Sequence, residues 1–174
     1  QNMAGLYTRD QAKTFIYALI YGGGVAMIGE IAGGSPRKGK QLVDKFMRNL
    51  PAYAKLKDKV LTSMRSSGTL RGLDGRRLRV ESEHSALNFL LQSAGAIVMK
   101  KALVLLDQKL IDHGIWYKFV ANVHDEWQIE VPKCHADKVG QLAVESIVKA
   151  GTHFNLRCPL DGEYKIGANW SETH

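Results

Sequence analysis

Four residues near the start of the chain have the chemistry and spacing to hold a nucleotide. Arg9, Lys13, Tyr17 and Tyr21 recur every four residues, so a helix would carry them as one slowly turning stripe. Arginine can fork onto phosphate oxygens, lysine supplies a mobile charge and a proton, and flat rings suit a sugar and a stacked base. Spacing alone is nevertheless more typical of an ordinary amphipathic surface helix with half-buried tyrosines.

An acidic turn is the second candidate site. His124, Asp125 and Glu126 stand between two alternating, strand-like segments, residues 119–123 and 127–131. A hairpin tip presents carboxylates outward, where Mg²⁺ and phosphate oxygens can reach them. Phosphoryl transfer uses two such ions, one to lower the pKa of the attacking hydroxyl and one to steady the leaving group. Because aspartate is common in turns, this motif by itself also fits a plain polar hairpin.

A polar stripe interrupts the long apolar segment that follows residue 84. His84, Asn88 and Gln92 are spaced i, i+4 and i+8, which places them on one face of a helix. The amides could pair with the backbone of neighbouring strands, because buried amides need partners. They could equally reach acceptors in the minor groove of DNA, which every base pair offers.

The elements that must position these residues alternate between helices and short hairpins. Thr8 is placed to cap a helix over residues 9–21 that packs through Ala12, Phe15 and Leu19 and ends at Gly22. Helices are also predicted over 25–32, 37–49, 51–66, 85–113 and 133–152, strands over 117–123, 127–131 and 157–166, and a hairpin over 68–80 with Asp74-Gly75 at its turn. The prediction is an α+β fold with a helical part, residues 1–80, and a part with an antiparallel sheet, residues 81–174.

The charge is distributed unevenly between these two parts. Residues 1–80 carry a net charge of +10 and residues 81–174 a net charge of −3. The basic part indicates a polyanionic partner or, equally well, a solvated basic surface. Cys134 and Cys158 form no metal-ligand pattern and fit a reducing cytoplasm. Because no uninterrupted run of about 18 apolar residues exists, no membrane partner is expected.

Several motifs together resemble those of family A DNA polymerases. Arg9-Asp-Gln-Ala-Lys13-Thr-Phe-Ile-Tyr17-Ala-Leu-Ile-Tyr21-Gly22 resembles the helix of the fingers subdomain. The His84 to Gln92 stretch resembles a palm helix, and Val123-His124-Asp125-Glu126 resembles the last palm motif. The hairpin residues Gly72 to Arg77 and the segment Gly167-Ala-Asn-Trp170 also match in position. The resemblance covers essentially the whole chain and is closest to replicative polymerases of podovirus-type bacteriophages.

The resemblance implies roles for the first stripe. Arg9 and Lys13 would contact the incoming deoxynucleoside triphosphate, and Lys13 would protonate the leaving pyrophosphate. Tyr17 would pack against the deoxyribose, where tyrosine implies weak discrimination against a missing 3′-hydroxyl. Tyr21 would hold the stacking position on the template side. Residues 1–80 would then form the fingers subdomain.

The resemblance also implies roles for the second part of the chain, residues 81–174, as the carboxy-terminal portion of the palm. Asp125 would be a catalytic Mg²⁺ ligand, Glu126 would support it, and His124 would approach the primer end. The remaining implied contacts with primer-template DNA come from His84, Asn88 and Gln92 in the minor groove and from Arg76 and Arg77 on backbone phosphates. Solvated hairpin arginines are an equally good reading of Arg76 and Arg77.

One part of the family's machinery is not found in this sequence. The other metal-binding aspartate belongs to a palm motif ahead of the fingers helix, and residues 1–8 contain no acid. We therefore expect the chain alone to be inactive. We also expect an amino-terminal polymerase chain or segment to supply the rest of the palm, the thumb and possibly an exonuclease. A split gene, cleavage or an excised fragment would each account for this, and the enzyme would work in the cytoplasm of a phage-infected bacterium.

Other functions remain open on the sequence. A non-catalytic DNA-binding module explains the basic part but gives Asp125 no purpose. A phosphohydrolase or nuclease would need more metal ligands than Asp161 and Glu163 add to the acidic turn. A fragment of a single-subunit RNA polymerase shares the general layout, although Tyr21-Gly22 and the Gln92 region fit the DNA enzymes better.

Overall fold

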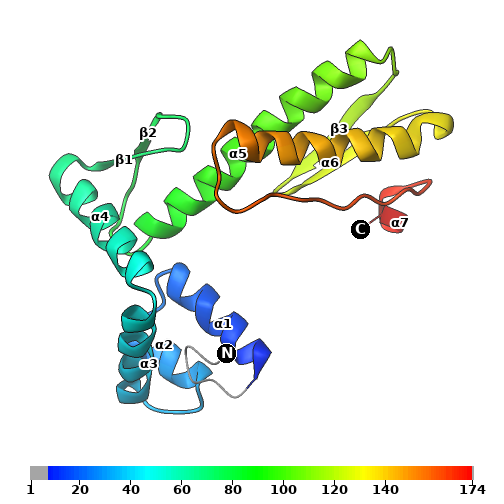
Figure 1. Ribbon diagram of the computed structural model, residues 1–174. Coiled ribbons are helices and arrows are strands. Elements are labelled where there is room, and N and C mark those ends of the chain that lie inside the picture. The colour runs from blue at the N-terminus through cyan, green and yellow to red at the C-terminus, as the bar shows by residue number, and fades with distance from the viewer. Residues whose placement is uncertain (1–7, 174) are drawn as a thin grey trace. The chain divides into compact units, whose positions relative to one another are not determined.

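Helices dominate the computed structural model, which describes residues 8–173 (Figure 1). Contacts divide the chain into two units, residues 1–92 and 93–174. The elements of the first unit are α1 (Arg9–Ile20), α2 (Val25–Ile31), α3 (Pro36–Asn49), α4 (Pro51–Ser67), β1 (Thr69–Arg71), β2 (Arg77–Arg79) and the start of α5 (Ala86–Asp112). The second unit holds the rest of α5, then β3 (Lys118–Val123), β4 (Glu126–Glu130), the 3₁₀ turn η1 (Lys133–His135), α6 (Ala136–His153) and α7 (Trp170–Thr173). The predicted α+β class is confirmed.

The first three helices pack around one aromatic core. Thr8 caps α1 as predicted, because its Oγ1 accepts a hydrogen bond from the backbone N–H of Gln11 at 3.1 Å. Phe15 of α1 is fully buried and meets Phe46 of α3 edge to face, with ring centroids 5.4 Å apart. Ile28 of α2 closes the same cluster. This core fixes which face of α1 points outward.

A second cluster anchors the hairpin β1–β2 to α4. Leu70 and Leu78, opposite each other in the strands, pack against Val60 of α4 and against Leu87 at the start of α5. Gly68, with a φ of +64°, ends α4 immediately before the first strand. The predicted hairpin over residues 68–80 is confirmed, with its strands at 69–71 and 77–79.

The long helix α5 belongs to both units and is unusually apolar. Its residues 86–92 lie in the first unit and the remainder in the second. By length and composition alone it could cross a membrane, with a mean hydropathy of 1.6 over its best window. The sequence shows no uninterrupted apolar run here, because isolated polar residues such as Gln92 lie within the helix. The mean hydropathy of the helix is nevertheless high. A single such helix is weak evidence for a membrane, since core helices pass the same test.

The second unit is built on the later turns of α5. Leu106 and Leu110 are fully buried against Val139 and Leu142 of α6 and against side chains of β3 and β4. β3 and β4 pair antiparallel, and their register shifts between Phe119 and Ala121. This shift marks a bulge at Val120, which is 65% exposed.

One predicted element of this unit is wrong. Residues 157–166 were expected to form a closing strand but are irregular. A strand needs a hydrogen-bonding neighbour, whereas this segment packs its side chains on α6. The ring of Tyr164 lies so close to Gly140 of α6 that an added Cβ would come within 2.2 Å of it, and Leu160 lies over Gly151 in the same way. The segment then continues to α7 (Figure 1).

The division after Gln92 falls within α5. It is a division by contacts and does not test the subdomain boundary that the sequence placed after Val80. The assignment of residues 1–80 to fingers and 81–174 to palm therefore remains a prediction.

Candidate nucleotide and metal sites

The predicted stripe on α1 lies on the exposed face of that helix. Arg9 and Lys13 are exposed, and Tyr17 and Tyr21 are each 51% exposed. The two tyrosine rings stack along the helix, with centroids 6.2 Å apart and an angle of 22° between their planes. The packing face predicted for α1 is confirmed, since Ala12, Phe15 and Leu19 are all buried.

The two cations of the stripe form no ion pairs with other described residues. Among residues 8–173, none of the ion pairs involves Arg9 or Lys13. An exposed guanidinium and an exposed ammonium four residues apart can both bind the oxygens of a phosphate chain. α1 can therefore present charge at its amino-terminal half and two aromatic faces at its carboxy-terminal half.

Tyr21 is held against residues of the predicted polar stripe, His84 to Gln92. The side-chain amide of Gln92 donates a hydrogen bond to the Tyr21 hydroxyl at 3.2 Å. Gly22 follows with a φ of +80°, and a Cβ at that position would lie 2.4 Å from the backbone oxygen of His84. Only glycine fits this backbone conformation and this close approach. The end of α1 and the start of α5, 71 residues apart, thus form one surface within the first unit.

The polar stripe of α5 is not one continuous helical face. α5 begins at Ala86, so His84 lies in the turn ahead of the helix. That turn is fixed by a hydrogen bond from the Ser85 N–H to the Ser82 hydroxyl and by the bidentate pair of Arg65 with Glu83, at 2.9 and 2.7 Å. His84 therefore precedes the helix that carries Asn88 and Gln92, and the contact of all three with DNA stays a prediction.

The three polar residues also differ in burial. His84 and Gln92 are exposed, whereas Asn88 is half-buried and its Oδ1 has no hydrogen-bond partner in the described part of the chain. A buried amide oxygen without a donor is costly. Among these three residues, Asn88 is therefore the one with an unsatisfied buried acceptor in the described part of the chain.

The acidic turn is a tight two-residue hairpin loop. Val123 pairs with Glu126, which leaves His124 and Asp125 as the loop residues. His124 has a φ of +53°, as the first loop position of the usual two-residue hairpins requires. Asp125 is exposed at the tip, and its carboxylate takes part in none of the hydrogen bonds or ion pairs described for residues 8–173.

Glu126, by contrast, is engaged by other side chains of the same unit. Its carboxylate accepts a hydrogen bond from the indole N–H of Trp170 at 3.0 Å and another from the amide of Gln128. The Gln128 amide oxygen in turn accepts from the Thr173 hydroxyl at 3.1 Å. The sequence motif did not reveal Trp170 and Thr173 as partners, because they come from a segment more than 40 residues away.

The residues around the tip offer few ligands for a metal ion. Asp125 offers a carboxylate, the hard oxygen ligand that divalent cations such as Mg²⁺ prefer. Within residues 8–173, no three His, Cys, Asp or Glu side chains are grouped so as to hold a metal ion. This donor set suits a metal that receives further ligands from elsewhere.

The two arginines predicted to bind DNA phosphates have different surroundings. Arg76 pairs with Asp74 in the same turn, at 2.6 Å, and this hydrogen-bonded cation holds the pKa of Asp74 below its usual value. Arg77 is exposed on β2 and joins none of the ion pairs described for the chain. The spacing of Asp74 and Arg76 could have signalled their pairing.

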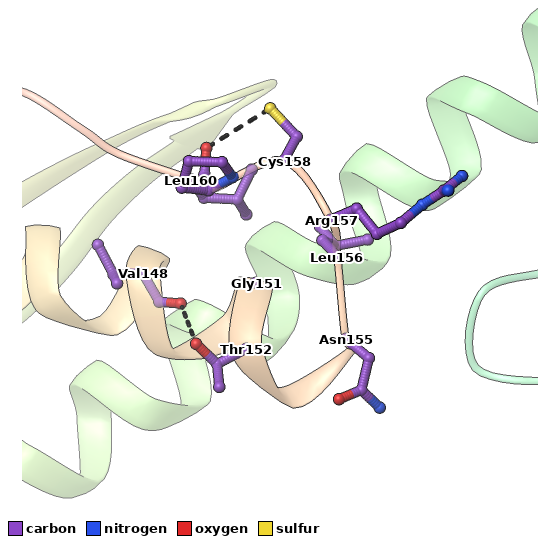
Figure 2. A pocket seen from close by; sticks show the side chains of 9 residues that line it. Val148, Gly151, Thr152, Asn155, Leu156, Arg157, Cys158 and Leu160 are labelled. Atoms are coloured by element: carbon purple, nitrogen blue, oxygen red, sulfur yellow. Dashed lines mark hydrogen bonds between the residues drawn. The ribbon is translucent and has the colours of Figure 1, made fainter.

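Two open cavities of the second unit lie away from the candidate site residues. One of about 460 Å³ is formed where α6 ends and the chain turns back (Figure 2). In Figure 2 the side chain of Arg157 extends away from Val148 and Leu160. None of the predicted site residues lines this cavity, so it offers no support for the nucleotide hypothesis. It is lined by Val148, Gly151, Thr152, Asn155, Leu156, Arg157, Cys158, Pro159 and Leu160.

The fold of the chain matches that of a solved structure. The structure is similar to a solved structure described as the POL domain of Pol1 from M. smegmatis in complex with DNA primer-template and dNTP, with a TM-score of 0.74. That similarity covers 82% of this chain and 27% of the other, at 24% sequence identity, and so establishes the fold.

Sequence comparison establishes the family. The model of DNA polymerase family A matches residues 3–172, and the chain belongs to this family. The DNA-directed DNA polymerases of Enterobacteria phage T3 and Escherichia phage T7 are each 38% identical to it over 198 aligned positions. The predicted family resemblance is confirmed, including its likeness to phage enzymes. The alignments take in the whole chain but only 28% of each relative.

Proposed function

We propose that this chain is the nucleotide-gripping and carboxy-terminal catalytic part of a phage DNA polymerase that extends a primer on a DNA template. The observation that carries the proposal is the exposed stripe of Arg9, Lys13, Tyr17 and Tyr21, in a chain that belongs to DNA polymerase family A. Both cations are unpaired within the described residues and both rings are half-exposed, as a nucleotide-binding surface requires.

The stripe would bind a deoxynucleoside triphosphate along its length. Arg9 and Lys13 would hold the phosphates, and the Lys13 ammonium would give a proton to the departing pyrophosphate. Tyr17 would pack against the sugar. Tyr21 would occupy the stacking position on the template side until the template base arrives, steadied by its hydrogen bond from Gln92 at 3.2 Å.

The acidic tip would serve the same reaction. Asp125 would hold a divalent metal ion, Mg²⁺ in the cell, and a bound ion there supplies charge that stabilises the transferring phosphoryl group. Glu126 would act as a positioning residue, because Trp170 and Gln128 already occupy its carboxylate. His124 would lie beside the primer end.

The DNA would be held by residues of the first unit. His84, Asn88 and Gln92 would contact the minor groove, where the side-chain amides of Asn88 and Gln92 would donate to the acceptors that every base pair offers. Arg77 would contact a backbone phosphate. These contacts read the shape of a base pair rather than its sequence.

The complete activity would need more than these residues. We propose that an amino-terminal polymerase segment supplies the remaining palm with the other metal-binding aspartate, the thumb and any exonuclease. The 174-residue chain alone would then incorporate no nucleotide. Primer extension by the purified chain with Mg²⁺ tests this directly, and measurable extension would refute it.

The main test replaces Lys13 with alanine in the complete polymerase. We expect the rate of nucleotide incorporation to fall about 10²-fold or more, because a charge contact and a proton donor are both lost. Thr14→Ala is the matched control, since Thr14 is exposed on the same helix beside the stripe. Single-turnover incorporation measures both variants. Equal rates for Lys13→Ala and Thr14→Ala would contradict the proposal.

A further inference from the structure

The hairpin β1–β2 has two faces of opposite chemistry. Its register pairs Leu70 with Leu78 and Arg71 with Arg77. Because side chains alternate along a strand, Leu70 and Leu78 point to one face, where they are 3% and 8% exposed. Arg71, Arg77 and Arg79 point to the other face, and all three are exposed.

The arginine face is a concentration of uncompensated charge. Arg71 and Arg77 are directly opposite each other, so their Cβ atoms are about 4.5–5.5 Å apart, and like charges in such pairs destabilise a hairpin. Within residues 8–173 no carboxylate pairs with Arg71, Arg77 or Arg79. The arginines nearby do have such partners: Arg76 has Asp74, and Arg65 has Glu83.

The arrangement suits a chain of phosphates. Arg77 and Arg79 are two residues apart on one strand, about 7 Å, so the face spreads its charge along the strand as well as across the pair. Guanidinium groups bind phosphate oxygens strongly, and a backbone with one charge per nucleotide can meet several of them at once. The only other side chain on this face of the ladder is Thr69, opposite Arg79, so little on it could read bases.

We propose that Arg71, Arg77 and Arg79 form a phosphate-binding face that holds the sugar-phosphate backbone of DNA, and that Arg76 is not part of it. The inference rests on the proposed function, since that function identifies DNA as the polyanion that this face binds. It assigns two arginines, Arg71 and Arg79, that the motif did not suggest. It also gives Arg76 a structural role in the turn.

The test measures binding of a fluorescein-labelled primer-template DNA to the full 174-residue chain between 50 and 200 mM NaCl. Arg71→Gln, Arg77→Gln and Arg79→Gln should each weaken binding several-fold. Each should also lower the slope of log affinity against log salt concentration by about one, because one phosphate contact is lost. Arg76→Gln is the matched control and should leave that slope unchanged.

A second readout needs no DNA. Removing one member of the opposed pair relieves like-charge repulsion, so Arg71→Gln should raise the melting temperature of the free chain by about 1–3 °C. Unchanged salt slopes in the three variants, a slope change as large in Arg76→Gln, or no DNA binding by the unaltered chain would each overturn the inference. The proposed function is judged separately, by incorporation in the complete polymerase. Normal incorporation with unchanged salt slopes would therefore refute the phosphate-binding face alone.

Discussion

The two hairpins of this chain each place an aspartate in the turn, but only one of those aspartates is used by the hairpin itself. Asp74, between β1 and β2, is hydrogen-bonded and ion-paired to Arg76. Asp125, between β3 and β4, has no such partner in the described part of the chain, whereas its neighbour Glu126 is held by Trp170. A turn carboxylate that forms no hydrogen bond or ion pair within its own hairpin is thus the better candidate for binding a ligand or metal ion.

The same comparison extends to the faces of the hairpins. In β1–β2 the turn residues Asp74 and Arg76 neutralise each other, so the net positive charge lies on the exposed face of the strands. β3–β4 packs Phe119, Trp127 and Ile129 against the helices and exposes its acid at the tip. This difference underlies the proposals that β1–β2 binds an extended polyanion and that the tip of β3–β4 binds a single metal ion.

The largest expected difference between the hairpins is catalytic. In the complete polymerase, Asp125→Asn should lower primer extension about 10³-fold or more, because a carboxylate ligand of the metal is lost. Asp74→Asn, the matching change in the other turn, should alter extension less than about twofold. DNA affinity should rise slightly in Asp125→Asn, since a negative charge is removed. Comparable extension by the two variants would show that the turns are equivalent.

The hairpins should also differ in how far single side chains support folding. Leu78→Ala should lower the free energy of unfolding by about 2–4 kcal/mol, because it leaves a cavity in the cluster with Val60 and Val80. Val120→Ala, at the exposed bulge of β3, should lower it by less than about 0.5 kcal/mol. Chemical denaturation of both variants measures the difference. A loss for Val120→Ala as large as that for Leu78→Ala would contradict the assigned burial.

Removal of the indole donor should have a smaller effect on the acidic tip. Trp170→Phe keeps an aromatic ring but deletes the hydrogen bond to Glu126, which is worth about 1 kcal/mol. We expect extension to fall about five-fold if Glu126 positions the tip. Trp116→Phe is the control, because Trp116 is 53% exposed and stands before β3. A fall of several hundred-fold would instead place Trp170 in the chemistry itself.

The smallest expected effect is on the pH dependence of thermal stability, through the pair of Asp74 and Arg76 in the β1–β2 turn. Arg76 lowers the pKa of Asp74 in the folded chain, so this pair stabilises the fold fully above the unfolded pKa of about 3.9. That contribution is lost as pH falls through the lower folded pKa. Arg76→Gln should therefore show a slightly shallower loss of thermal stability below pH 4 than the unaltered chain. Identical acid profiles would indicate that the pair is open in solution.

Much of this architecture could be predicted from local sequence. The cap at Thr8, the buried face of α1 and the hairpin over residues 68–80 each follow from short-range patterns, because neighbours in the chain determine them. The absent strand at residues 157–166 could not be foreseen, since a strand depends on a partner elsewhere. His84 lies in the Ser82–Ser85 turn just ahead of α5, which begins within one residue of the predicted start.

The candidate residues of the sites could be chosen from the sequence, but the side chains that hold them in place could not. Arg9, Lys13 and Asp125 could be chosen from residue type and motif, and their exposure fits those choices. The bond from Gln92 to Tyr21 and the bond from Trp170 to Glu126 join residues 71 and 44 positions apart. No local pattern encodes such pairs, because they arise only when the units fold.

The bond between Trp170 and Glu126 also gives the acidic tip a built-in optical reporter. Indole emission responds to nearby charge, and the carboxylate that holds this indole is adjacent in sequence to Asp125. A cation arriving at the tip would alter the field at the ring and shift its fluorescence. Occupancy of the tip could then be followed by light, without any label and without turnover.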